Sequence, residues 1–227
     1  MFKTFLAFWQ GKDFLSKILD EFNNMCVDTE DMFNSVLEKI LNGKEDAGLK
    51  DRIYKVDKKV NDLERDIRKR IVEHLSVRPT VDVPACLLMM SVVKDAERIG
   101  DYCKNLYEVT ELLNKPVNIQ GFKDLFGNID EEIKVEFTKT RKAFVKSDAN
   151  LAREVLEIET AIVRKCDSIL KRMAQSGVDT NTAVCLTLIA RYFKRIAAHL
   201  ANIGSSVILP ISELDFFDEK LRREKVK

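Results

Sequence analysis

The chain has 227 residues, of which 45% are hydrophobic and 33% charged, and its formal net charge is +1 at pH 7. This length suits one large domain or two of about a hundred residues each, and the balanced charge excludes a global field that would draw the protein onto nucleic acid. The chain has only four prolines and eight glycines, which favours long helices over sheets with their many turns.

Apolar residues recur in steps of three and four along most of the chain, a pattern typical of helices packed at coiled-coil-like angles. In the first half the pattern predicts three helices, which run from Leu15 to Ile40, from Ile53 to Ile71 and from Met89 to Leu113. The expected breaks are Asn42–Gly43, the loop 76–82 and the segment 114–116. Asp82 and Pro84 are expected to cap and open the third helix.

The same order returns in the second half. The predicted helices run from Phe122 to Phe144, from Leu151 to Met173 and from Leu186 to Val207, with Asp179 capping the last and Pro210 ending the fold. Short loops make neighbouring helices antiparallel, so we expect an all-α protein of two tandem antiparallel three-helix bundles. The expected units are 1–116, which includes an aromatic N-terminal extension over residues 1–9, then 117–210, and a charged tail over 211–227.

The five cysteines are scattered and form no Cys-x-x-Cys pair. Their apolar neighbours predict small buried hydrophobes in a reducing compartment rather than disulfides or a zinc site. The apolar run at residues 1–9 is too short for a secretion signal, and the run 83–93 is about half of a membrane span. We therefore expect a cytoplasmic protein.

Part of the third helix returns in altered form in the sixth. Residues 94–102 read KDAERIGDY, and residues 192–199 read YFKRIAAH, which superposes Arg98 on Arg195. The acids Glu97 and Asp101 of the first copy become Lys194 and Ala198 in the second. The chain therefore contains a duplicated unit whose charged site is kept in one copy only.

Glu97 and Asp101 are four residues apart and so share one face of a helix. The facing helix carries a second polar set beside its apolar seam, formed by Asp57, Asn61 and Glu64. Carboxylates gathered at this density raise one another's pKa or need a compensating cation. That cation can be a lysine or arginine, with Arg98, Lys58 and Lys94 as candidates, or a divalent metal, for which oxygen ligands favour Mg²⁺, Ca²⁺, Mn²⁺ or iron.

A solvated acidic face without metal is the simpler alternative, because a third of the residues are charged. We call the place where the second and third helices are expected to meet the first groove, and its counterpart between the fifth and sixth helices the second groove. In the second groove, Glu159 corresponds to Asp57 and Lys194 to Glu97. We therefore predict a Glu159–Lys194 salt bridge there and no metal. A di-iron oxidase is excluded, because such sites use Glu-x-x-His pairs and the residues three positions before His74 and His199 are isoleucines.

The segment AERIGDYCKNL at 96–106 resembles the repeated motif of the PhoU family, regulators of bacterial phosphate uptake, in which Glu-Arg-Ile-Gly-Asp-His is followed by Asn three residues on. The segment DKKVNDLE at 57–64 resembles the family's motif on the preceding helix. The resemblance covers about residues 10 to 209 and includes the duplication. Tyr102 stands where the family has His, and a histidine survives only as His199 of the second copy.

The resemblance implies a non-enzymatic, cytoplasmic adaptor that works with the ATPase subunit of a phosphate transporter and a sensor histidine kinase. Such a protein would be a homo-oligomer, with a homodimer as the expected form, and would reach the membrane only through its partners. The resemblance also implies iron or zinc on the acidic motifs and no organic cofactor. Carried over to this chain, the metal ligands would be Glu97 and Asp101 with Asp57, Asn61 and Glu64.

The departures from the family motif keep two alternatives open. One is a relative that regulates a sodium–phosphate cotransporter or another ion transporter. The other is a metal-free helical interaction module that holds its partners through helix-in-groove contacts.

Overall fold

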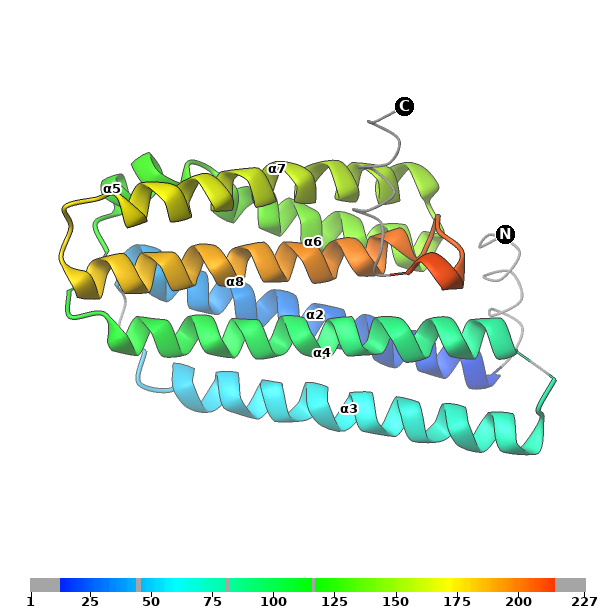
Figure 1. The fold of residues 1–227 in the computed structure, drawn as a ribbon. Coiled ribbons are helices and arrows are strands. Elements are labelled where there is room, and N and C mark those ends of the chain that lie inside the picture. The colour runs from blue at the N-terminus through cyan, green and yellow to red at the C-terminus, as the bar shows by residue number, and fades with distance from the viewer. Residues whose placement is uncertain (1–12, 44–45, 81, 116, 215–227) are drawn as a thin grey trace, which may run out of the picture.

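The computed structural model of the chain describes residues 13–43, 46–80, 82–115 and 117–214 (Figure 1). The helices are α2 (Asp13–Asn42), α3 (Leu49–Val77), α4 (Val83–Leu112), α5 (Ile119–Phe126), α6 (Ile129–Lys146), α7 (Ala149–Ala174) and α8 (Thr180–Ser205), followed by the 3-10 helix η1 (Ile211–Glu213). No strand occurs within these described ranges.

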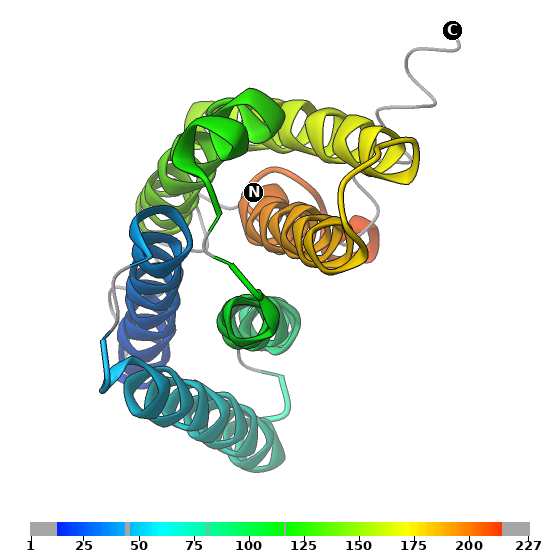
Figure 2. The ribbon, with the colours of Figure 1, turned by 90° about the vertical axis from the view of Figure 1, so that its left-hand side faces the viewer.

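Viewed along the helices, α3, α2, α6 and α7 form a curved outer row, and α4 and α8 lie on the inner side of that curve (Figure 2). Helix α4 packs against α2, α3 and α8, and helix α8 packs against α4, α6 and α7. The two inner helices run antiparallel (Figure 1). The all-α arrangement of two tandem three-helix bundles is therefore confirmed, and the halves meet where α4 packs on α8 and α2 packs on α6.

One continuous apolar core runs through all seven α-helices of the described ranges. Its centre is a cluster of phenylalanine rings from both halves. The ring centroid of Phe193 on α8 lies 5.8 Å from that of Phe33 on α2 and 5.8 Å from that of Phe126 on α5. Phe33 also contacts Phe137 of α6 at 5.5 Å. Burial of these rings ties the two repeats into one unit.

The predicted fourth helix is wrong in one respect, because the structure divides it into α5 and α6. Gly127 between them has a φ of +63°, a left-handed conformation that side chains with a Cβ rarely adopt. Asn118 caps α5 by accepting hydrogen bonds from the backbone N–H groups of residues 120 and 121. Within α5, Phe122 and Phe126 are one turn apart and stack on one another, with centroids 4.3 Å apart, and both rings are buried.

Of the two predicted helix caps, Asp179 caps its helix and Asp82 does not. The Asp179 side chain accepts a hydrogen bond from the backbone N–H of Thr182 at 3.1 Å, which confirms the predicted cap of α8. Asp82 occupies the position before α4 but makes no capping bond. Its Oδ2 instead lies 3.2 Å from Nε2 of His74, so the side chain holds the end of α3 to the start of α4.

The end of the chain also differs from the expected tail. Beyond Pro210 the chain forms η1, which packs against α4, and the side chain of Leu214 is buried. The expectations for the aromatic segment 1–9 and for the basic end of the tail lie outside the described residues. Within the described ranges, no helix is long and apolar enough to cross a membrane.

The cysteines have the burial that their apolar neighbours predict. Four are buried, Cys26 is partly buried, and none forms a disulfide. Burial raises the pKa of the Cys86 thiol to about 11 and that of the Cys166 thiol to about 12. A thiolate is the reactive form of cysteine, so these thiols are chemically inert at neutral pH.

Because Phe193 joins both halves of the core, its truncation should destabilise the whole protein in a single transition. We expect Phe193→Ala to lower the free energy of unfolding by about 3–5 kcal/mol, measured by urea denaturation and circular dichroism. Val184→Ala on the exposed side of the same helix is the control and should stay within about 0.5 kcal/mol of the parent. Two separate unfolding transitions would contradict a shared core.

Candidate functional site

The acidic residues predicted to gather between the second and third helices do so, and a lysine stands between them. Lys104 of α4 donates hydrogen bonds from Nζ to Oδ2 of Asp57 on α3 and to Oδ1 of Asp101 on α4, each at 2.9 Å. Asp57 is buried, so its charge requires a close partner. The cation of the first groove is therefore the ammonium group of Lys104.

The remaining acids of the first groove also have cationic partners. Arg98 Nη1 lies 3.4 Å from Oδ2 of Asp101, and its Nε lies 3.6 Å from Oε2 of Glu97. Glu64 Oε1 is 3.1 Å from Nη2 of Arg68, one turn along α3. The role predicted for Arg98 is confirmed, whereas Lys104 and Arg68 were not identified from the sequence.

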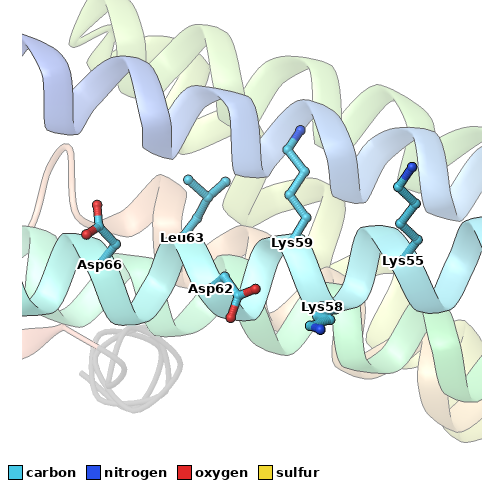
Figure 3. Close-up of a pocket in the computed structure, with 6 residues that line it drawn as sticks. All are labelled: Lys55, Lys58, Lys59, Asp62, Leu63 and Asp66. Carbon is cyan, nitrogen blue, oxygen red and sulfur yellow. The ribbon is translucent and has the colours of Figure 1, made fainter.

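Lys58, another predicted cation, lies on a different face of α3. With Lys55, Lys59, Asp62, Leu63 and Asp66 it lines a shallow open depression (Figure 3). Lys59 spans from this face to α2, where its Nζ lies 2.7 Å from Oδ2 of Asp28.

Three polar groups of the first groove are not fully compensated by hydrogen bonds or opposite charges. Oδ1 of Asp57 and Oδ1 of Asn61 are buried and have no hydrogen-bond partner among the described residues. The pKa of Glu97 is raised, first by burial and then by the nearby charge of Asp101, and Arg98 only partly offsets this. An acid whose pKa is raised on folding stabilises the fold only at low pH, so Glu97 weakens the fold once it ionises.

The donor set itself fits a metal, since buried carboxylate and amide oxygens are ligands for hard cations. In the structure, the ammonium group of Lys104 already lies between Asp57 and Asp101, and a metal ion would have to displace it. The described part of the chain contains no group of three or more His, Cys, Asp or Glu side chains placed to hold a metal ion.

In the second groove the predicted Glu159–Lys194 pair is wrong. Lys194 Nζ lies 2.6 Å from Oδ1 of Asp167, which is about two turns farther along α7 than Glu159. Because α7 and α8 run antiparallel, Lys194 lies level with Cys166 and Asp167, and its charge lowers the pKa of the buried Cys166 thiol against the larger effect of burial. The predicted acid–base compensation is present, with a different acid.

A third polar cluster, missed in the sequence, joins the two repeats where α4 meets α8. Asp95 of α4 is almost completely buried, at 1% exposed. Its Oδ1 lies 2.7 Å from Nδ1 of His199 and accepts a hydrogen bond from Nδ2 of Asn202 at 3.0 Å. Its signal in the sequence is an aspartate inside an apolar helix face, which a buried polar partner explains.

Aromatic side chains continue this cluster. The ring of Tyr102 stacks on His199 with centroids 5.6 Å apart and lies 5.9 Å from the ring of Tyr192. Arg195 donates from Nε to the Tyr102 hydroxyl at 3.2 Å. In the repeat alignment Tyr102 corresponds to His199 and Asp95 to Tyr192. The contact between Asp95 and His199 and the contact between Tyr192 and Tyr102 are therefore equivalent, as expected for repeats related by an approximate twofold axis.

The site offers charge and contact surface rather than a reactive group. Both histidines are bonded to aspartates and stacked on aromatic rings: His74 on Phe14, with centroids 4.1 Å apart, and His199 on Tyr102. The cysteine nearest the first groove, Cys103, is fully buried with a raised pKa, and its Sγ donates to the backbone oxygen of Thr29.

The structure consists of two antiparallel helical repeats whose last helices, α4 and α8, pack on each other, and each of these helices carries charged side chains bonded to its outer neighbour. This arrangement defines a tandem helical-bundle protein. The sequence model of the PhoU domain matches residues 22–110 and 130–207, one copy in each half. The chain belongs to the PhoU family.

Individual relatives are distant. The chain is 24% identical over 187 residues, 79% of this chain and 77% of the relative, to a phosphate-specific transport system accessory protein PhoU homolog of Pseudomonas aeruginosa. It is also 24% identical over 185 residues to the Pseudomonas putida protein of the same description, which covers 78% of this chain and 72% of that one.

Solved structures share the fold. The crystal structure of PhoU from Pseudomonas aeruginosa gives a TM-score of 0.74 at 21% identity, covering 86% of this chain and 95% of that one. The phosphate transport system regulatory protein PhoU from Streptococcus pneumoniae gives the same TM-score at 15% identity, covering 96% and 98%. At these identities the likeness establishes the fold alone.

Removal of the Lys104 ammonium group should leave Asp57 with an uncompensated buried charge. We expect Lys104→Met to lower the free energy of unfolding by about 1–3 kcal/mol, measured by urea denaturation at neutral pH. Lys58→Met, on the other face of α3, is the matched control and should be nearly neutral. In the Lys104→Met background, Asp57→Asn should restore part of the loss; equal losses for the two lysine variants would contradict this role of Lys104.

Proposed function

We propose that the protein is a non-enzymatic accessory regulator of phosphate transport. The observation that carries this proposal is the match of the PhoU domain to both halves of the chain, together with relatives described as phosphate-specific transport accessory proteins that align with more than three quarters of it. The inert thiols and the aspartate-bound histidines support a binding role over a catalytic one.

In the finer form of the proposal, the chain links the ATPase subunit of a phosphate transporter to a sensor histidine kinase. The two grooves differ in charge: the first holds four acids with Lys104, Arg98 and Arg68, whereas the second presents Lys194, beside Arg195 at the junction. Different charge patterns favour different partners, because mismatched charges suppress wrong associations. The protein would act in the cytoplasm, as a homo-oligomer, and meet the membrane through these partners.

The identity of the partners is tested by affinity purification of the tagged full chain from its native host. Cells are grown in high and in low phosphate, and bound proteins are identified by mass spectrometry. Recovery of a phosphate-transporter ATPase together with a histidine kinase supports the adaptor role. Recovery of a sodium–phosphate cotransporter or an ion channel instead would assign the protein to another branch of the same fold.

Regulation is tested with a phosphate-starvation reporter in cells that lack the protein. We expect the reporter to be active in high phosphate without the protein and to be repressed again by the wild-type chain. Glu97→Ala/Asp101→Ala removes two acids of the first groove and should fail to restore repression. Lys58→Ala/Asp62→Ala, on another face of α3 (Figure 3), is the control and should repress normally. Full repression by the groove variant would make the first groove incidental.

A divalent metal or an iron or zinc cluster in the first groove is a further part of the proposal. The unpartnered oxygens of Asp57 and Asn61 support it, and Lys104 competes for the same position. We expect Lys104→Gln to bind more metal than the wild type, measured by elemental analysis after incubation with Mn²⁺, Fe²⁺ or Zn²⁺ and desalting. Lys58→Gln is the control; equal metal contents in all three proteins would contradict a metal site in this groove.

A further inference from the structure

Glu136 of α6 is a completely buried carboxylate, and neither Oε1 nor Oε2 has a hydrogen-bond partner among the described residues. One turn earlier on α6, Glu132 lies nearer the surface, and its Oε1 accepts from Nζ of Lys165 at 2.5 Å. Buried polar groups are nearly always hydrogen-bonded, so Glu136 requires an explanation.

The charged groups nearest to Glu136 are themselves acidic. Helix α7, which packs against α6, places the buried Glu159 close enough to act on it electrostatically, and Glu132 acts from its own helix. Burial is the largest effect on the Glu136 carboxyl, and all three effects raise its pKa well above the ordinary value of 4.5. An ionised Glu136 would place two negative charges together in an apolar interior.

Five basic side chains on α6 and α8 have partners other than Glu136. From α8, Lys194 bonds Asp167 on α7, Arg195 bonds Tyr102 on α4, and His199 bonds Asp95 on α4. On α6 itself, Lys139 bonds Glu154 of α7, and Arg141 lies 3.6 Å from Glu30 of α2. Glu30, the acid of α2 that faces α6, also accepts from Oγ1 of Thr138 at 3.3 Å.

The two repeats differ in the positive charge beside the matching acids Asp57 and Glu159. In the first half Lys104 supplies the positive charge beside Asp57. The repeat alignment matches Asp57 with Glu159 and Lys104 with Ala201, which is completely buried. The ammonium group of the first half thus has no counterpart at the matching position, and the second half has an additional buried acid, Glu136.

We propose that Glu136 binds a proton in the folded protein and that the neighbouring Glu159 holds it there, so that the second half contains a buried proton-binding site between α6 and α7. A neutral carboxyl avoids the cost of burying an isolated charge. Among the described residues, no group of three or more His, Cys, Asp or Glu side chains is placed to hold a metal ion. This inference goes beyond the proposed regulatory function and does not rest on it.

The consequence is a fold whose second half weakens in alkali. A carboxyl whose pKa is higher in the folded than in the unfolded protein stabilises the fold below its unfolded value, and this stabilisation is lost as the pH rises through the folded value. Loss of the proton would put two like charges between α6 and α7. In the first half the matching acid, Asp57, is bonded to Lys104.

The test is a pH titration of the full-length protein with ¹³C-labelled glutamate side chains, in which NMR follows each carboxyl carbon. We expect one resonance with a midpoint far above all the others, and we expect Glu136→Gln to remove that resonance. Glu159→Gln should lower the same midpoint, because it removes the second cause of the raised pKa, without returning it to the ordinary value. Glu157→Gln, on the exposed side of α7, is the matched control and should leave it unchanged.

Thermal unfolding gives an independent readout of the same site. Glu136→Gln should match the wild type in acid and exceed its Tm by about 2–4 °C in alkali, a shift typical of a modest stabilisation in a chain of this size. The proposal is overturned if no glutamate resonance stands apart in the wild type. It is also overturned if EDTA or added Mg²⁺ moves the raised midpoint, because the ligand would then be a metal ion.

Discussion

The antiparallel packing of α4 on α8 is the constraint on which the rest of the structure depends. Asp95 is buried in this interface, and a buried carboxylate is tolerable only with close hydrogen-bond donors. His199 and Asn202 supply them from the other repeat. The contact therefore favours the register in which His199 and Asn202 lie beside Asp95. The inner helices α4 and α8 each carry one side of a charged cluster, with α3 and α7 as the outer partners.

The two repeats balance the charge of their grooves by different means. In the first, Lys104 joins α3 to α4 by bonding an acid from each. In the second, Lys194 joins α8 to α7 through Asp167, at another level of the helix pair. The same backbone arrangement therefore presents two surfaces with different charge patterns.

Much of the fold could be predicted from the sequence, because helix formation follows an apolar period that is local in the chain. The helix break at Gly127 was missed because the apolar spacing continues across the glycine, whereas its φ of +63° interrupts the helix. The acids of the first groove were identified for the same reason: residues four apart share a helix face whatever the fold.

The partners of those acids could not be predicted with equal success. Lys104 is three residues from Asp101, but only the register of α3 on α4 brings it to Asp57. The partner of Lys194 was predicted wrongly for the same reason. An alignment of the repeats shows which positions correspond, but it does not show which residues of two antiparallel helices lie side by side. Asp95 and Glu136 were missed because the burial of an acid depends on three or more helices, and a single-helix pattern contains no such information.

The covalent connection between the repeats has an evolutionary consequence. A symmetric dimer of identical three-helix subunits would carry every substitution twice, once in each groove. Here the loop between α4 and α5 joins the copies into one chain (Figure 1), so a change such as lysine to alanine at the position shared by Lys104 and Ala201 affects one groove alone. Because the halves belong to one chain, each can vary independently, and yet the Asp95–His199 and Tyr192–Tyr102 contacts still lie at equivalent positions of the two repeats.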